Sequence, residues 1–439
     1  MTGLVRRTAL VFGVLALCAT GAFAELQNVE IGGAISIGGW YYNYDSLPSS
    51  AYMDQWTRLH VKADFTDEVS ALIEFDNYSV WGEDFRSNYL TGADGRGNGD
   101  TDLYQAYIEA KNLWGTPLTL KVGRQEIMLG DEWLVGNNSL ASPLFGLSFD
   151  ALRLTYGAET FSVDAIAAKL AEGLGDFGKD DTNLYAVYFS YTGVEDHVFD
   201  AYWMYVQDDA SATAFEVDLH TLGLRAAGAF GAFDYSAEAA WQLGGADGLP
   251  GAFGFDEADT DYDTPGATAS VGYTFDTTWT PRVYAAATWL DGGDPDDSLW
   301  SNDRTLPFNR LFSDVDYTSI LAFTDMSNVR WYALGVEVAP TDAVGLFLQM
   351  AHLEADELAL RTGGFLFGTG PSSRQLGWEA AIGATYQYSE DLSFALTYAH
   401  FFGNDGLEGN NILGNGLRPW AGDGDDEYDT VFANASLSF

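Results

Sequence analysis

Hydrophobic residues alternate with small or polar residues along most of this chain, in stretches of about ten residues. In "FDYSAEAAWQ", which runs from Phe233 to Gln242, every second residue is aromatic or alanine and most of the others are polar. A repeat of two places successive side chains on opposite faces of a β-strand. The sequence therefore predicts an all-β fold whose strands have one apolar and one polar face.

This alternation predicts eighteen strands, an even number. They lie near residues 29–43, 55–65, 69–79, 103–112, 117–129, 149–157, 160–170, 183–192, 197–207, 215–227, 231–243, 267–276, 281–291, 329–339, 343–353, 375–388, 391–402 and 427–439.

From the second strand onward, every other link is very short, and the links between those are mostly long. The short links are 66–68, 112–116, 157–159, 193–196, 228–230, 276–280, 340–342 and 389–390. The long, hydrophilic links are 81–102, 129–148, 244–266, 292–328, 354–374 and 403–426. Long and short links thus fall at opposite ends of a meander, which is typical of an outer-membrane barrel with short periplasmic turns and long extracellular loops. Tandem soluble sandwiches, the alternative, give no reason for this segregation.

Membrane chemistry favours the same fold. Beyond the first residues the chain has no apolar run of about 18 residues or more, so no transmembrane helix is expected. Lipid offers no hydrogen-bond partners, so strands that cross it must close into an antiparallel transmembrane β-barrel. Aromatic residues lie where interfacial girdles belong, at Tyr41, Tyr42, Trp203, Tyr205, Trp289, Trp331, Tyr332, Tyr386 and Tyr388.

Residues 1–24 have the pattern of a cleaved signal peptide. Arg6 and Arg7 precede an apolar run, and "AFA" at 22–24 is a typical cleavage site. Cleavage of a lipoprotein at Cys18 is the alternative, disfavoured by the large Leu17 before it. Cys18 is the only cysteine, so residues 25–439 are expected to form one barrel domain without disulfides or thiolate chemistry. The predicted location is the bacterial outer membrane.

The C-terminal "TVFANASLSF" places Val431, Ala433, Ala435, Leu437 and Phe439 on one strand face. It resembles the last-strand signal by which bacterial outer-membrane proteins are recognised for insertion. The barrel-assembly machinery is therefore a predicted partner, along with outer-membrane lipid. An ordinary edge strand is the alternative, but it would be prone to aggregation in a soluble protein. In a closed barrel this strand pairs with the first.

Charge excludes some partners. The chain carries a formal charge of -44, and removing residues 1–24, with two arginines and no acid, lowers it to -46. Nucleic acid is therefore an improbable partner. A monomer is expected, with a trimer as the alternative.

No enzyme or cofactor is predicted. The histidines at 60, 197, 220, 352 and 400 lack the spacing of a transition-metal site. No Gly-x-Ser-x-Gly segment or supported Ser/His/Asp arrangement is present. A hydrolase with its site at the barrel rim stays an alternative.

Acidic clusters in the long links could hold Ca²⁺ or Mg²⁺ through hard oxygen ligands. None has EF-hand spacing, so a solvated anionic rim is the favoured interpretation and a cation site the alternative. The residues concerned are Asp259, Asp261 and Asp263 in one link and Asp423, Asp425 and Asp426 in another.

Strand parity predicts which charged residues face the lumen. In the second strand Leu59 and Val61 face lipid, so Arg58 and Lys62 face inward. The same reasoning places Glu74, Asp76, Glu109, Lys111, Lys121, Arg153, Arg225 and Arg282 inward, together with Asp200, Asp234, Glu238, Glu337 and Glu379. Opposed charges across a constriction would select charged solutes. The alternative is that they only pair with one another.

The segment "KVGRQEIMLGDEWLVG", residues 121–136, raises a separate question. Val122 and the residues two and four before it share one face, whereas Ile127 and Leu129 have the opposite parity. We predict a β-bulge at Gly123 and Arg124 that absorbs one residue and turns both Arg124 and Glu126 into the lumen.

Three motifs resemble the alginate-export family of outer-membrane channels: "LYQAYIEA" at 103–110, "LKVGRQEIMLGDEWLVG" at 120–136 and "FDALRLTYG" at 149–157. The resemblance implies a barrel that conducts an anionic polysaccharide outward past inward arginines, matched here by Arg124 and Arg153 and more loosely by Arg58. Two features depart from it. The chain is more acidic than a polyuronate conduit should be, and it lacks a long periplasmic link that could gate export.

The first functional hypothesis is a passive porin for small charged solutes or sugars, constricted by the links 81–102, 129–148 and 292–328. An exporter of alginate-like anionic polysaccharide is the second. A surface structural or adhesion barrel with cation-binding acidic loops is the third.

Overall fold

The computed structural model describes residues 26–44, 47–82, 101–138, 146–172, 181–209, 216–247, 259–294, 303–319, 327–357, 373–407 and 427–439. The predicted signal peptide, residues 1–24, lies outside them. Within these ranges no helix combines the length and apolar character needed to cross a membrane.

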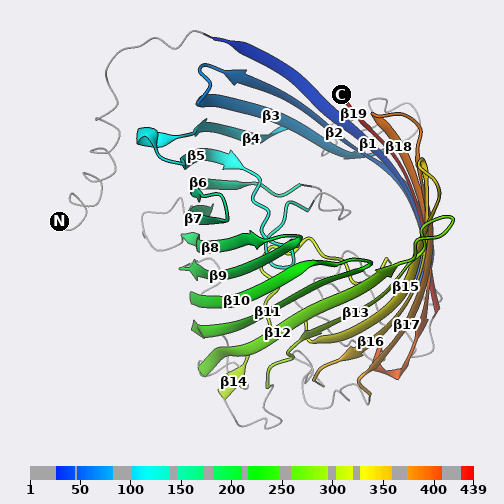
Figure 1. Cartoon of the computed structure of the whole chain (residues 1–439). Helices are drawn as coiled ribbons and strands as arrows, with labels where there is room; N and C mark the ends of the chain where they lie inside the picture. The colour runs from blue at the N-terminus through cyan, green and yellow to red at the C-terminus, as the bar shows by residue number, and fades with distance from the viewer. Residues whose placement is uncertain are drawn as a thin grey trace, which may run out of the picture.

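Eighteen long strands form one closed antiparallel barrel (Figure 1). A nineteenth strand, β14, has only three residues and pairs in parallel with β12. The strands are β1 (Asn28–Tyr44), β2 (Leu47–Asp64), β3 (Val69–Val80), β4 (Thr101–Ala110), β5 (Leu118–Gln125), β6 (Phe149–Gly157), β7 (Phe161–Ala171), β8 (Thr182–Val194), β9 (His197–Asp208), β10 (Glu216–Phe230), β11 (Phe233–Asp247), β12 (Asp259–Thr274), β13 (Arg282–Leu290), β14 (Asp303–Thr305), β15 (Val329–Thr341), β16 (Val344–Ala355), β17 (Gln375–Gln387), β18 (Leu392–Gly403) and β19 (Glu427–Ser438). Two 3-10 turns are η2 (Leu113–Gly115) and η4 (Asp405–Leu407).

The barrel closes through β1, which pairs with β2 on one side and β19 on the other. Ile35 lies opposite Leu437, and the backbone of Phe439 exchanges hydrogen bonds with that of Gly33 at 2.9 and 3.0 Å. In Figure 1 the first and last strands run side by side. Closure removes the free sheet edges that a membrane could not solvate, and the predicted eighteen-stranded barrel is confirmed.

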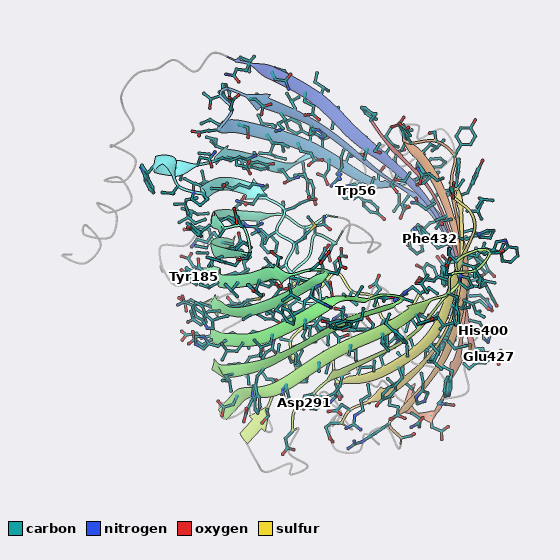
Figure 2. The ribbon with its side chains drawn as sticks, viewed as in Figure 1. Trp56, Tyr185, Asp291, His400, Glu427 and Phe432 are labelled. Atoms are coloured by element: carbon teal, nitrogen blue, oxygen red, sulfur yellow. The ribbon has the colours of Figure 1, made fainter. Side chains whose placement is uncertain are left out.

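Side chains alternate across the wall as predicted. Leu59 on β2 and Ile73 on β3 are half exposed on the outer face, at 48% and 49%. Glu74, next to Ile73, is buried on the inner face. Figure 2 shows Trp56 inside the barrel and Tyr185 at its outer edge. The outer surface is thus apolar and suited to lipid, while the inner surface carries the charge.

One irregularity among the first strands lies on β4. Between β3 and β4, Glu74 lies opposite Gln105 and Phe75 opposite Leu103, so Tyr104 is the extra residue of a bulge. A bulge re-aims side chains. Here it leaves both Tyr104 and Gln105 on the inner face, where each contacts a carboxylate.

Candidate channel constriction

Two segments leave the wall and fold into the barrel interior. The first is 126–137, directly after β5, and the second is 306–319, between β14 and β15. Their backbones pair: Phe312 N donates to Leu134 O at 2.8 Å, and Gly136 N donates to Phe312 O at 2.8 Å. The two segments, although about 180 residues apart in the chain, thus form one unit, which we call the constriction unit.

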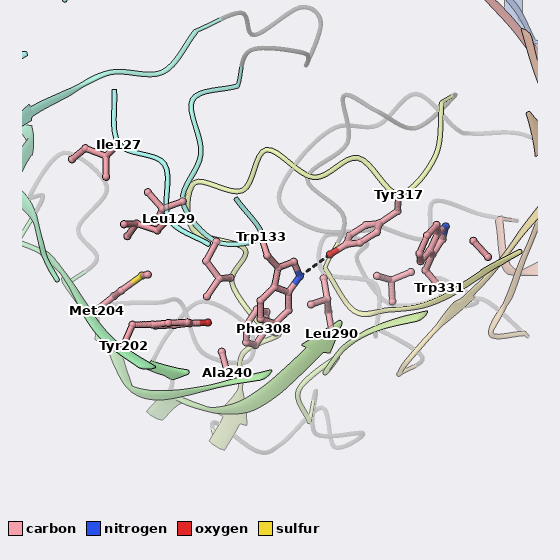
Figure 3. Close-up of a cluster of buried hydrophobic side chains, with 14 of the residues drawn as sticks. Ile127, Leu129, Trp133, Tyr202, Met204, Ala240, Leu290, Phe308, Tyr317 and Trp331 are labelled. Atoms are coloured by element: carbon pink, nitrogen blue, oxygen red, sulfur yellow. Dashed lines mark hydrogen bonds between the residues drawn. The ribbon is translucent and has the colours of Figure 1, made fainter. Parts of the chain in front are cut away.

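The constriction unit has its own hydrophobic core (Figure 3). Trp133 stacks on Phe308 with ring centroids 5.6 Å apart, and its indole Nε1 donates a hydrogen bond to Tyr317 Oη at 3.0 Å. Trp133, Phe308 and Tyr317 are all at least 97% buried. The core continues into inward-facing wall residues, among them Met204, Ala240, Leu290 and Trp331. Burying these large side chains anchors the unit to the wall strands β9, β11, β13 and β15.

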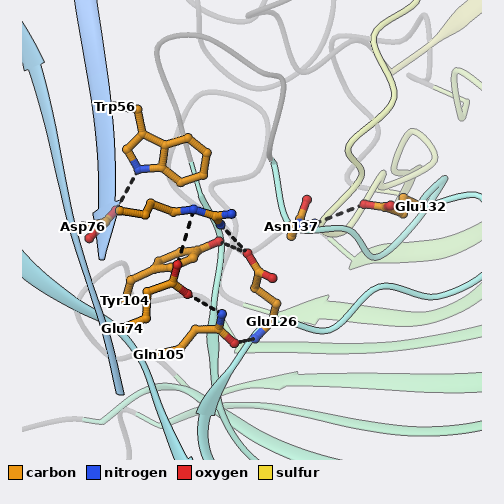
Figure 4. A network of polar contacts seen from close by, with 9 residues as sticks. Trp56, Glu74, Asp76, Tyr104, Gln105, Glu126, Glu132 and Asn137 are labelled. Atoms are coloured by element: carbon orange, nitrogen blue, oxygen red, sulfur yellow. Dashed lines mark hydrogen bonds and ion pairs between the residues drawn. The ribbon is translucent and has the colours of Figure 1, made fainter. Parts of the chain in front are cut away.

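One polar attachment joins the unit to the early strands (Figure 4). Glu126 accepts hydrogen bonds from Arg58 Nη1 at 3.1 Å and from Tyr104 Oη at 2.6 Å. Arg58 also contacts Glu74, with Nε to Oε1 at 3.4 Å. The backbone N–H of Glu126 donates to Gln105 Oε1 at 3.1 Å. Glu126 is therefore on the lumen side, in the position predicted for it.

A second attachment joins the unit to β9, β10 and β11. Arg225 contacts Asp200 at 2.7 Å and also pairs with Asp131 of the unit, which accepts a further hydrogen bond from Ser236. Burial alone would raise the pKa of the Asp131 carboxyl, but the hydrogen bonds and charge of Arg225, together with Ser236, lower it below its ordinary value. Asp131 therefore stays ionised at neutral pH and holds the unit to the wall.

The later segment has attachments of its own. Gln242 Nε2 donates to Asn309 O at 2.6 Å, and Asn309 N donates to Gln242 Oε1 at 2.6 Å. Ser319 N donates to Glu379 Oε1 at 2.9 Å. The constriction unit thus touches both halves of the barrel wall.

Most of the remaining predicted lumen residues are ion-paired, whereas Asp76 and Glu238 accept hydrogen bonds from Trp56 and Tyr202. Lys121 and Lys111 both contact Glu109, at 3.5 and 3.2 Å. The other contacts are Lys62 with Asp64 at 3.6 Å, Arg153 with Asp164 at 2.7 Å, and Arg282 with Asp234 at 2.7 Å and Glu337 at 3.1 Å; Asp76 accepts a hydrogen bond from Trp56 at 3.0 Å.

Arg124 faces outward, and the predicted bulge at Gly123 and Arg124 is wrong. The register between β5 and both neighbours is continuous through this point. Arg124 therefore shares the outer face with Val122, where it donates two hydrogen bonds to Asp150, at 2.8 and 2.9 Å. Both residues lie at the end of their strands next to the long loop, and the ion pair partly neutralises the charges there. Gly123 is still needed, because an added Cβ would lie 2.2 Å from Ala106 O.

The cause of the error is the environment of Ile127 and Leu129. We assigned their parity as though they faced lipid, but both are buried in the constriction unit. The link 129–148, expected to be hydrophilic, carries the apolar residues Leu134 and Val135, and these were the signal for an inward fold. The link also contains Asp131 and Trp133, which the sequence reasoning did not select.

The predicted constricting links can be compared only in part. The described portions of 129–148 and 292–328 fold inward and pack together in the constriction unit. In the link 81–102, residues 83–100 lie outside the described ranges.

The described structure shows no cation site, the alternative interpretation of this acidic cluster, at Asp261 and Asp263, and the side chain of Asp259 lies outside what it describes. Asp261 and Asp263 are exposed on β12, and Asp263 accepts a hydrogen bond from Trp241 at 2.8 Å. In the described ranges no three His, Cys, Asp or Glu residues gather closely enough to hold a metal ion. Asp423, Asp425 and Asp426 lie outside those ranges.

Comparison with known proteins identifies the family. A family model described as alginate export matches residues 43–410. Among solved structures the chain is similar to Pseudomonas aeruginosa OccK8 (OprE), with 13% identity and a TM-score of 0.57 over 93% of this chain and 98% of that one. It is also similar to Pseudomonas aeruginosa OccK2 (OpdF), with 11% identity and a TM-score of 0.58 over 95% and 99%. Acinetobacter baumannii OccAB2 gives 13% identity and a TM-score of 0.58 over 95% and 100%. No curated protein sequence matches the chain.

The structural similarities, at such low identity, concern the fold, and they agree with the closed barrel. The family match covers most of the chain and agrees with the motifs at 103–157. The chain therefore belongs to the alginate export family and is a channel of the bacterial outer membrane.

Proposed function

We propose that the protein is a passive channel for small hydrophilic solutes and that it prefers cations. The observation that carries the proposal is the pairing of the inward arginines. Arg58, Arg225 and Arg282 each contact two carboxylates. Each of these arginines, together with its two carboxylates, therefore has a net formal charge of about minus one. These groups lie in a partly enclosed lumen, where charge is screened less than in water.

The narrowing of the lumen by the constriction unit supports the same function. The constriction unit occupies part of the lumen and is fixed to the wall by buried aromatic packing and by ion pairs. Inward-folded segments narrow a barrel of this size, which would otherwise leave a wide aqueous channel. We therefore expect small solutes to pass and large polymers to be excluded while the unit is in place.

Export of an anionic polysaccharide is the second candidate, and the family match favours it. Such a polymer needs cations that are free to bind its carboxylates. Arg58, Arg153, Arg225 and Arg282 are already held by acidic side chains of the chain itself. A passing polyanion would have to compete with these pairs and would meet their surplus negative charge, so we place this candidate second.

Two experiments separate the candidates. Purified protein in planar bilayers should give stepwise currents; a barrel that serves only as a surface structure or adhesin would give none. Liposomes containing the protein should swell in small neutral sugars and in amino sugars, but not in oligouronates of several residues. Fast swelling in oligouronates, with little in amino sugars of similar size, would favour the exporter. We expect a monomer, and cross-linking in native membranes tests this.

A further inference from the structure

The guanidinium of Arg58 lies in a cage of two aromatic rings and two carboxylates, which we call the Arg58 cage. Figure 4 labels the residues that form its walls, Trp56, Tyr104, Glu74 and Glu126. The carbon Cζ of Arg58 is 4.6 Å from the centroid of the Trp56 ring and 5.6 Å from that of Tyr104. Its nitrogens contact Glu74 at 3.4 Å and Glu126 at 3.1 Å. Three neighbouring strands and the constriction unit each supply a wall.

The walls are held by bonds that do not involve Arg58. Trp56 Nε1 donates to Asp76, and Tyr104 Oη donates to Glu126 at 2.6 Å. Gln105 Nε2 donates to Glu74 at 2.6 Å, and the two rings meet edge to face, with centroids 6.0 Å apart. Because these contacts are independent of Arg58, the cage is expected to keep its shape when the guanidinium leaves it.

The chemistry of the cage fits one class of ligand. Aromatic faces attract cations through their quadrupole, and carboxylates hydrogen-bond to guanidinium and ammonium groups. Anions would be repelled by Glu74 and Glu126, and neutral solutes would gain neither attraction. Emptied of Arg58, the cage would hold two carboxylates without their resident cation, which is costly in a partly desolvated site.

We propose that the Arg58 cage is a transit site for solutes that carry a guanidinium or primary ammonium group, and that Arg58 is a resident occupant that such a solute displaces. This rests on the proposed function, since the solute must enter the lumen, and it names the class of cargo. Two other inward cations have part of this arrangement, with one aromatic ring and one or two carboxylates. Lys121 lies 4.4 Å from the Tyr107 ring centroid beside Glu109, and Arg282 lies 5.1 Å from that of Tyr284 beside Asp234 and Glu337. The lumen thus offers the same chemistry at several points along its wall.

Displacement has a consequence for the constriction. Glu126 belongs to the constriction unit, and its ion pair with Arg58 is one of the unit's attachments to the wall. A solute in the cage would take over the contact with Glu126. Because Arg58 competes to regain this contact, binding of the solute is expected to be reversible and brief, as transport requires.

The test uses agmatine, which carries a guanidinium and an ammonium group, and urea, an uncharged planar analogue of the guanidinium group alone. Potassium currents through single channels are recorded while either compound is added. In the wild type agmatine should interrupt the current at concentrations where urea has no effect. Arg58→Ala should lower the half-blocking agmatine concentration by about fivefold, because the competing cation is gone. Trp56→Leu should raise it by about threefold through loss of a cation–π contact.

Arg124→Ala is the matched control, since it removes an arginine from the outer face and should leave the half-blocking concentration unchanged. All variants must migrate differently before and after boiling, which verifies that they are folded. Agmatine that acts no better than urea, or a blocking concentration that does not fall in Arg58→Ala, would overturn the transit site while potassium current still supports the channel. Complete absence of potassium current in folded wild-type protein would overturn the proposed function and the transit site together.

Discussion

Tyr317 links the two halves of the constriction unit, so its hydroxyl should control how often the unit opens. It accepts a hydrogen bond from Trp133 at 3.0 Å and also bonds to Thr288 on β13. Tyr317 is 3% exposed and Trp133 only 1%. Tyr317→Phe keeps the ring and its packing but leaves the indole N–H of Trp133 buried without its partner. Such a loss costs about 1 to 3 kcal/mol.

That cost is paid only while the unit is closed, because an opened unit exposes the indole N–H to water. Each 1.4 kcal/mol changes an equilibrium about tenfold, so the ratio of open to closed states should rise by about 5- to 150-fold in Tyr317→Phe. Single-channel recording measures it as the fraction of time spent at the higher conductance level. Tyr185→Phe is the control, since Tyr185 lies on the outer face of β8. Equal occupancy of the higher conductance level in Tyr317→Phe and wild type would refute the assignment of this hydrogen bond as the one that keeps the unit closed.

Three further predictions follow from the assigned positions. Arg124→Ala should leave the ion selectivity unchanged because Arg124 faces outward. Arg153→Ala should increase the cation preference because it frees Asp164. The reversal potentials of the two variants test whether each arginine lies on the outer or the inner face of the barrel. The pKa of Asp131 is lowered below 3.8, so its contact with Arg225 is fully formed above that pH and is lost as pH falls through the lowered value. Conductance should therefore be constant from pH 7 to about pH 4 and rise below it. A rise between pH 7 and pH 5 would contradict this assignment. Deleting Phe439 should reduce the amount of boiling-sensitive protein in the outer membrane, because its backbone closes the barrel against Gly33 and its side chain is expected to be recognised during insertion. The conductance of the channels that do assemble should not change.

The barrel could be predicted because strand parity is a local property. Every long strand lies close to its predicted range, since lipid on one side and water on the other force the alternation. The largest differences are at the starts of β2 and β12, which begin at Leu47 and Asp259 rather than near 55 and 267. The sequence prediction places residues 244–266 in a hydrophilic link ahead of β12. In the structure Pro265 lies opposite Trp241 and the pairing with β11 continues past it.

The constriction could not be predicted in the same way, because it depends on contacts between distant parts of the chain. Nothing near Ile127 indicates that residues 306–319 will cover it, and those residues come about 180 positions later. Parity correctly placed Arg58 and Arg225 on the inner face. Each has one partner on a neighbouring strand, but the other partner, Glu126 or Asp131, comes from the inward-folded segment. Parity gives the face of a side chain, whereas its partner depends on how the loops fold.

The reversal potential of the wild-type channel tests the proposed cation preference most directly. It is recorded in a planar bilayer between high and low potassium chloride. If carboxylates outweigh the paired arginines along the path, the zero-current voltage will have the sign of a potassium-selective pore and will shrink when the lumen carboxylates are protonated at low pH. A voltage of the opposite sign, showing chloride selectivity, would contradict the proposed cation channel and would favour a conduit for anionic solutes.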